Sequence, residues 1–170
     1  MGGYITLAIA EKYSEMLHSI GLLHSTAFAD NEERKQSRLK SIEFIKNNGA
    51  ISFLRTSLPG LFADKFTQEH NDVVEKLIDA GRSFSSEILI QYQRAMMSRP
   101  DRIAVLQKTI LPVLFIVGEK DPLIPLQQSL AQCHFPSTAS VHILPNSAHA
   151  GMLEESELCI DAIKSFLKNV

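Results

Sequence analysis

Two polar side chains follow apolar runs in the C-terminal third of the sequence. Asp121 comes three residues after Gly118, which ends the apolar run 113–117. His149 lies in the loop after a second apolar run, residues 141–144, and is twenty-eight residues beyond Asp121. A carboxylate can orient a histidine and stabilise its protonated form, while the histidine takes a proton from a nucleophile and returns it to a leaving group. Asp121 and His149 therefore fit the supporting half of a nucleophilic triad.

Each residue has a simpler explanation when it is taken alone. An aspartate in a Gly-x-x-Asp-Pro loop is commonly a turn residue, and a histidine among Pro, Asn and Ser is commonly just exposed. Asp121 and His149 each follow a predicted parallel strand, in the order that a triad requires. This arrangement favours the triad interpretation over a simple turn residue and an exposed histidine. Gly118 is predicted to let the backbone turn sharply, and Pro122 and Pro125 to stiffen the loop that holds Asp121.

The elements that must position these residues form a regular alternation. Run 113–117 is apolar without alternation, which is typical of a strand covered by helices on both faces. The predicted order is strand 113–117, helix 126–133, strand 140–144 and helix 156–168. This order predicts a parallel α/β layer with right-handed crossovers. Because parallel strands end at one edge of the sheet, we expect Asp121 and His149 to lie within hydrogen-bonding distance.

The first 29 residues are predicted to add one helix and one strand to this layer. Residues 1–13 read as a helix, with Ile5, Ala8 and Ile9 on one face and two glycines at its start that allow close approach to a strand. Residues 17–23 read as a short strand. We interpret the following His24 and Ser25 mainly as polar residues at a strand end, with a pocket role as the alternative.

Residues 30–106 carry helical signals and no strand signal, so we predict a helical cap inserted into a core of residues 1–29 and 107–170. Asp30 is predicted to cap a helix that Gly49 ends, with Glu33 reaching back to it. Thr67 and Ser85 or Ser86 are predicted to cap later helices. In the same region Ile88, Leu89, Tyr92 and Met96 are expected on an inner face.

Two of these residues, Tyr92 and Met96, are candidates to line a substrate pocket. Core packing or simple surface exposure explains them equally well from the sequence alone.

Composition excludes several other functions. A formal charge of -2 provides no basic face for nucleic acid. No apolar run approaches the roughly 18–20 residues of a membrane span. Cys133 and Cys159 lack the spacing of a metal or redox motif, which favours a reducing cytoplasm. The six histidines show no metal-ligand spacing, so we expect no metal and no cofactor. We interpret Glu119, Glu154 and Glu155 as solvated charges.

Residues 118–125 (GEKDPLIP) and 146–154 (NSAHAGMLE) resemble the acid and histidine loops of the α/β-hydrolase superfamily. The helical region lies where that family carries its cap. The opening residues Met1, Gly2 and Gly3 resemble the second half of the family's nucleophile elbow, Gly-x-Ser-x-Gly, read from the residue after the serine. The chain therefore resembles the C-terminal two-thirds of the family's domain, without the serine and without the strand that leads to it.

The resemblance implies a role for each matching residue. A serine before Met1 would attack an ester or other acyl carbonyl, His149 would act as base and then acid, and Asp121 would orient it. The backbone N–H of Met1 would be one oxyanion-hole donor. The expected substrate is a small ester or acyl compound. Haloperoxidase-like, carbon–carbon hydrolase and acyltransferase activities stay open, as does a dehalogenase with aspartate as nucleophile.

Two further hypotheses concern the chain as it is given. It is either an inactive fragment of a cytoplasmic hydrolase or a non-catalytic module that uses the fold to bind a ligand or partner. Because the strand 17–23 would be an unpaired edge, with apolar residues Ile5, Ile9, Ile20 and Leu22 left exposed, we expect a homodimer through residues 1–24.

Overall fold

The computed structural model describes residues 1–170, which divide into two compact units. The first unit comprises Met1–Phe28 and Asp101–Val170, and the second comprises Ala29–Pro100. Helix α7 (Ile103–Lys108) belongs to the first unit, where Leu106 is buried in the core. From the sequence, residues 103–106 of this helix are expected in the cap. A role of the second unit as a cap stays a prediction.

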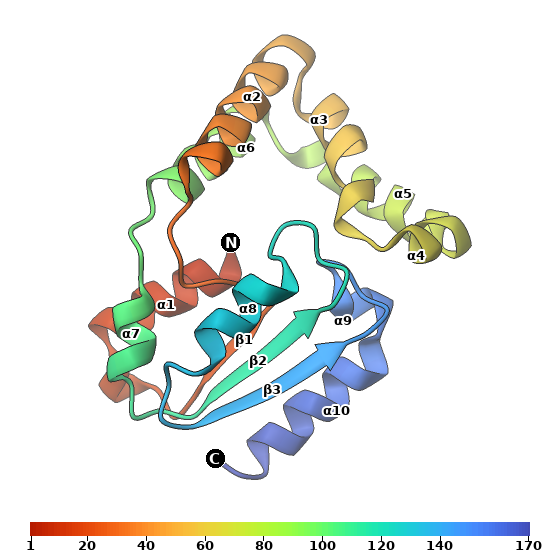
Figure 1. The fold of residues 1–170 in the computed structure, drawn as a ribbon. Helices are drawn as coiled ribbons and strands as arrows, with labels where there is room; N and C mark the ends of the chain where they lie inside the picture. Colours follow the sequence, from red (N-terminus) through yellow and green to blue (C-terminus); the bar gives the residue numbers. More distant parts are fainter. The chain divides into compact units, whose positions relative to one another are not determined.

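The first unit is built on a parallel sheet with the strand order β1-β2-β3 (Figure 1). Its strands are β1 (Ile20–Leu23), β2 (Val113–Gly118) and β3 (Ala139–Leu144). The predicted parallel layer is confirmed, but β1 is shorter than expected. In the register Ile20 lies opposite Val113, and the residue before Val113 is Pro112, which has no N–H to donate. The ladder therefore does not extend back to Leu17, and a 3₁₀ turn, η1 (Ser14–Met16), precedes the strand.

Helices cover both faces of this sheet (Figure 1). On one face α1 (Gly2–Lys12), α7 and α8 (Leu126–Cys133) pack against a core that includes Ile20, Leu22 and Phe115. On the other face α10 (Ser156–Leu167) packs against Leu114 and Ile116. Every residue of β2 is buried, as its uninterrupted apolar sequence predicts for a strand covered on both sides.

Helix α1 buries a different face from the one predicted. Leu7 and Ala10 are buried, whereas Ile5 and Ile9 are 53% and 42% exposed. A Cβ atom on Gly3 would lie 2.1 Å from the hydroxyl oxygen of Ser25, so the helix approaches the end of β1 closely at Gly3. Positions 3, 7 and 10 follow one stripe of a helix, and that stripe faces the sheet.

The second unit is wholly helical, and the predicted absence of strands is confirmed. Its elements are α2 (Glu32–Asn48), α3 (Ala50–Ser57), η2 (Pro59–Leu61), α4 (Asp64–Glu69), α5 (Asn71–Ala80), η3 (Gly81–Ser83) and α6 (Ser86–Ser98). Helices α2 and α6 pack together through Ile42, Ile45, Leu89 and Ile90. Leu89 of the predicted inner face is buried, whereas Ile88 and Tyr92 are exposed.

The helix boundaries of this unit test the predicted caps. Ser85 accepts a hydrogen bond from the backbone N–H of Ile88 and caps α6 as predicted. The predictions for Asp30 and Thr67 are wrong. Asn31 caps α2 by accepting from the N–H of Arg34, and Thr67 lies inside α4.

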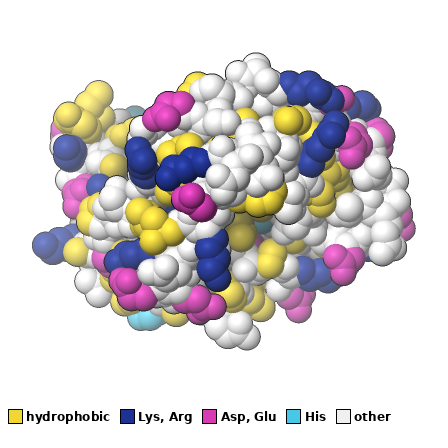
Figure 2. All heavy atoms as spheres, turned by 90° about the horizontal axis from the view of Figure 1, so that it is seen from above, with side chains coloured by type: hydrophobic (Ala, Val, Ile, Leu, Met, Phe, Trp, Pro, Cys, Tyr) yellow, Lys and Arg dark blue, Asp and Glu magenta, His cyan; other side chains and the backbone are white.

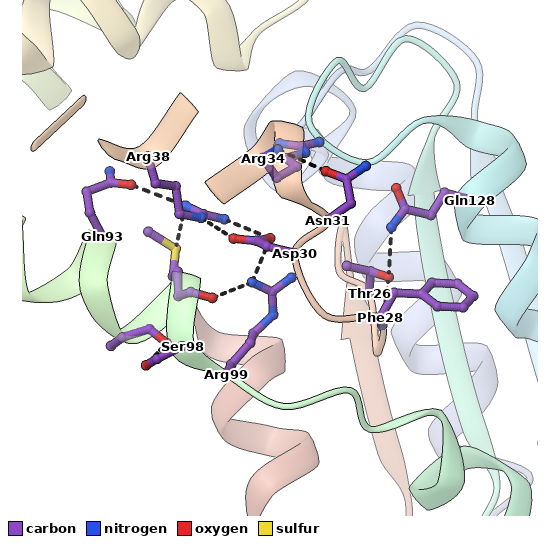
Figure 3. Close-up of polar contacts among 12 residues, drawn as sticks. Thr26, Phe28, Asp30, Asn31, Arg34, Arg38, Gln93, Ser98, Arg99 and Gln128 are labelled. Atoms are coloured by element: carbon purple, nitrogen blue, oxygen red, sulfur yellow. Dashed lines mark hydrogen bonds and ion pairs between the residues drawn. The ribbon is translucent and has the colours of Figure 1, made fainter. Parts of the chain in front are cut away.

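Asp30 instead forms the centre of a buried ion-pair cluster (Figure 3). Its carboxylate pairs with Nε of Arg38, and Nη1 of Arg99 lies 2.8 Å from its Oδ1 atom. Burial raises the pKa of Asp30, but the hydrogen bonds and charges of the two guanidinium groups outweigh it and lower the pKa. Because Arg38 comes from α2 and Arg99 follows α6, the cluster joins the two ends of the unit.

The surface carries both signs of charge. On the face in Figure 2, basic and acidic side chains are interspersed, and neither sign forms a continuous patch. No helix in the chain combines the length and the apolar character that crossing a bilayer requires.

We predict that Asp30→Asn lowers the free energy of unfolding at pH 7 by about 3–5 kcal/mol, because it leaves two guanidinium groups without their counter-charge. The folded-state pKa of Asp30 is depressed, so its contribution is present above the unfolded pKa of about 3.9 and is lost as the pH falls below it. Urea unfolding at pH 7 and pH 3 measures this difference.

Asp72→Asn is the matched control, because Asp72 pairs with Lys76 on the surface of α5. The control should change stability little. Equal stability of Asp30→Asn and wild type at pH 7 would contradict the role of the cluster.

We also predict a homodimer through residues 1–24, because β1 has a strand partner on one side only. Ile5 and Ile9 are exposed as expected, but Ile20 and Leu22 are buried, so they do not add to the apolar surface. Light scattering should give the mass of two chains, and Ile5→Glu should shift it toward one. Ile110→Glu, at an 88% exposed site outside this region, is the control. A folded wild-type monomer at micromolar concentration would refute the dimer.

Candidate active site

Asp121 and His149 meet at the carboxyl edge of the sheet. In the register Gly118 of β2 lies opposite Leu144 of β3, so the loops that follow the two strands leave the sheet side by side. Nδ1 of His149 lies 2.8 Å from Oδ2 of Asp121, which is the hydrogen bond expected from the sequence. Asp121 is 5% exposed, whereas the side chain of His149 is 26% exposed. The carboxylate is therefore enclosed while part of the imidazole stays accessible.

The surroundings of Asp121 stabilise its ionised form. Its Oδ1 atom accepts hydrogen bonds from the backbone N–H groups of Leu123 and Ile124, at 2.8 and 2.9 Å. Burial alone would raise the pKa of Asp121. The hydrogen bond and charge of His149, the neighbouring His24 ring and the backbone donor of Ile124 outweigh burial and hold the pKa well below its usual range. An ionised Asp121 favours a proton on Nδ1 of His149 and leaves Nε2 as the basic nitrogen.

Gly118 brings the two loops together by close approach. A Cβ atom at this position would lie 1.9 Å from the carbonyl oxygen of Ala148 and 2.7 Å from that of Ser147. The chain turns directly after this glycine, as predicted, and the N–H of Asp121 donates to the Gly118 carbonyl at 3.4 Å, but Gly118 has no positive φ. The residue is small so that the His149 loop can lie against the end of β2. The N–H of Lys120 also donates to the Ser147 carbonyl at 3.0 Å.

Two glutamates that the sequence analysis interpreted as solvated hold the His149 loop. Oε2 of Glu154 accepts from the backbone N–H groups of Ala148 and Ala150, at 3.0 and 3.1 Å. Glu155 accepts from the N–H of Asn146 and from the hydroxyl of Ser147. Both residues lie at the junction of α9 (Gly151–Glu154) and α10, within reach of the preceding loop. The prediction for them is wrong, because the loop folds back over this junction.

His24 joins the same site, although the sequence analysis interpreted it mainly as a strand-end residue. It is 4% exposed and has a φ of 45°, a conformation that is uncommon outside glycine. Its Nδ1 atom lies 3.8 Å from Oδ2 of Asp121, and its Nε2 accepts from the N–H of Gly151 at 3.1 Å. The sequence does indicate this location for His24, because His24 directly follows β1 and β1 pairs with β2, the strand before Asp121.

Ser25 lies just after β1, against Gly3 of α1. It is buried, and its carbonyl accepts from Nε2 of Gln132, a fully buried α8 residue whose Oε1 accepts from the N–H of Ala27. Gln128 donates to Thr26 in the same segment (Figure 3). Helix α8 thereby fixes the chain after β1, a role that the sequence analysis missed.

The remaining predicted site residues lie at the start of α1 and on α6. Gly2 and Gly3 open α1, and the carbonyl of Met1 accepts from the N–H groups of Tyr4 and Ile5. Tyr92 and Met96 lie on α6 in the second unit, where Tyr92 is exposed and the Met96 sulfur accepts from Arg38. Their proposed pocket roles, and that of Ser25, stay predictions.

A cavity of about 590 Å³ lies at the opposite edge of the sheet, before β1 and β2. Its lining includes Glu15, Leu17, Lys108 and Leu111. No group of three or more His, Cys, Asp or Glu side chains is arranged to hold a metal ion.

The fold has close matches among solved structures, although the sequence matches no family model and no curated protein. A thermophilic esterase from Thermogutta terrifontis matches 99% of the chain with a TM-score of 0.90 and 26% identity. MGS-M2, an alpha/beta hydrolase enzyme from a Medee basin deep-sea metagenome library, matches 98% with a TM-score of 0.87 and 23% identity. The enol-lactonase from Burkholderia xenovorans LB400 matches 99% with a TM-score of 0.87 and 18% identity.

The chain has a partial α/β-hydrolase fold. It spans less than two thirds of these solved proteins, covering 62%, 62% and 63% of their lengths. In this fold the ends of three neighbouring strands deliver His24, Asp121 and His149 to one edge of the sheet.

We predict that Gly118→Ala lowers the free energy of unfolding by about 1–3 kcal/mol, because the new methyl group meets the Ala148 carbonyl and the loop must move. Urea unfolding measures the loss. Gly60→Ala is the matched control, since a Cβ there meets nothing within 4 Å. A Gly118→Ala variant as stable as that control would show that the loop relaxes freely.

Proposed function

We propose that the chain is the C-terminal part of a serine hydrolase that acts on small ester or acyl substrates, with the nucleophile in sequence that precedes Met1. The hydrogen-bonded pair of Asp121 and His149 at the carboxyl edge of the sheet carries this proposal. Similarity over 99% of the chain to a thermophilic esterase supports it. Coverage of only 62% of that esterase supports the assignment to a part of a longer domain.

In this mechanism Nε2 of His149 takes the proton of the nucleophile hydroxyl as that oxygen attacks the acyl carbonyl. The imidazolium that forms is stabilised by the ionised Asp121, which stays ionised because three groups donate hydrogen bonds to it and the His24 ring lies 3.8 Å away. His149 then gives the proton to the leaving group. Water repeats the cycle on the acyl-enzyme and regenerates the free hydroxyl.

The start of α1 is proposed to stabilise the negative charge on the carbonyl oxygen. Gly3 lies against Ser25, so the N-terminus of α1 is at the same sheet edge as Asp121 and His149. Helix N-termini favour negative charge, and the backbone N–H of Met1 would supply one donor directly after the nucleophile. Gly2 and Gly3 would complete the turn from the nucleophile into the helix.

The helical second unit is proposed to act as a cap that shapes the substrate pocket, with Ser25, Tyr92 and Met96 as candidate lining residues. We place the protein in the cytoplasm, in keeping with its two free cysteines. A non-catalytic module with the same fold is the competing function, and the sequence encoded directly upstream of Met1 discriminates between them. A Gly-x-Ser preceding Met1 in frame supports the hydrolase.

The test compares the 170-residue chain with the same chain extended by its own upstream coding sequence. On an activated ester the 170-residue chain should show no turnover, because His149 has no nucleophile to activate. The extended protein should hydrolyse the ester, and His149→Ala should lower its kcat by about 10⁴–10⁶-fold.

His18→Ala is the control, because His18 is exposed and lies on the segment before β1. The control should keep the activity of the extended protein. Turnover by the 170-residue chain that disappears with His149→Ala would refute the need for an upstream nucleophile. An extended protein without activity would favour the binding module.

A further inference from the structure

His24 has two unusual features that the triad does not require. Its backbone adopts a φ of 45°, which costs energy for a residue with a side chain unless the surroundings impose it. Its Nδ1 atom is buried and has no hydrogen-bond partner, which makes it the exception among the buried side-chain nitrogen and oxygen atoms of the chain. A buried polar atom without a partner carries a desolvation cost, so its placement calls for an explanation.

The hydrogen bond to Nε2 determines which nitrogen of His24 carries the proton. Because Nε2 accepts from the N–H of Gly151, it holds a lone pair, and the neutral ring carries its proton on Nδ1. That proton is directed to the side of the ring where Oδ2 of Asp121 lies 3.8 Å away. The separation is beyond hydrogen-bonding distance, so the interaction is electrostatic, between an N–H dipole and a buried carboxylate.

The imidazole ring of His24 packs directly against Gly151. A Cβ atom on Gly151 would lie 2.5 Å from Nε2 of His24, so only glycine at the start of α9 admits the imidazole. The rings of His24 and His149 are 5.9 Å apart and inclined at 61°. The groups that face His24 are therefore the Asp121 carboxylate, the His149 ring and the backbone N–H of Gly151, from the loops after β2 and β3.

We propose that His24 is a positioning residue, which holds Asp121 and the His149 loop in register by directing Nδ1–H toward Oδ2 of Asp121 while Nε2 anchors Gly151. The inference rests on the proposed function, because it assigns His24 to the same site. Two imidazoles then share one carboxylate oxygen. His149 makes the hydrogen bond, and His24 adds favourable electrostatics on the buried side without competing for that bond.

The first test is the protonation state of His24, read from long-range ¹H–¹⁵N correlation spectra of the labelled chain at pH 7.5. We expect a neutral ring with the proton on Nδ1, and for His149 two ring-nitrogen shifts that are widely separated because Asp121 fixes one tautomer. A proton on Nε2 of His24, or a doubly protonated ring, would overturn the inference.

Two variants separate the polar role of His24 from its volume. His24→Phe keeps a ring but no N–H dipole, and His24→Asn keeps an amide donor near the place of Nδ1 and tolerates positive φ. In His24→Phe the two ring-nitrogen shifts of His149 should converge, because its tautomers interconvert. In His24→Asn they should stay apart. His18→Asn, at an exposed histidine, should change nothing.

Unchanged His149 shifts in a folded His24→Phe protein would refute the positioning role. If His24→Phe does not fold, the tautomer of His24 in the wild-type chain and the His149 shifts of His24→Asn still decide the question. Failure of the proposed function would be seen differently, as an extended protein without turnover, and would leave the ring-nitrogen shifts as they are.

Discussion

The buried carboxylate of Asp121 is the constraint around which the first unit is arranged. A charge at 5% exposure needs donors from several directions, and the fold supplies them from separate segments. Backbone N–H groups of its own loop satisfy Oδ1, while His149 and His24 approach Oδ2 from the loops after β3 and β1. The contacts of one side chain therefore connect the loops that follow three paired strands.

Close backbone approaches make this convergence possible. Gly3, Gly118 and Gly151 each stand where a Cβ atom would lie within 2.5 Å of a neighbouring atom. Gly3 lets the end of β1 lie against α1, and Gly118 lets the His149 loop lie against β2. Gly151 leaves room for the His24 ring beside α9. None of the three has a positive φ, so their common property is small size rather than conformational freedom.

The helical second unit also contains a buried carboxylate whose charge is compensated by neighbouring groups. Asp30 is a buried carboxylate that two guanidinium groups compensate, one from α2 and the other from the residue that follows α6. As with Asp121, the group is stable in its charged form because its partners lower its pKa more than burial raises it. In both units a single acid therefore links separate segments of the chain.

The sequence by itself determined the parallel strands, their helices, the helical region and the pairing of Asp121 with His149, because each depends on local periodicity or on the shared edge of a parallel sheet. Only the tertiary structure decided which face of α1 is buried, that Asp30 is an ion-pair centre rather than a cap, and that Glu154, Glu155, Gln132 and His24 support the site. These roles arise from contacts between segments that are far apart in the chain or folded back on one another. A single sequence carries no local signal for such contacts, since the same residue types serve equally well as caps, solvated charges or strand ends.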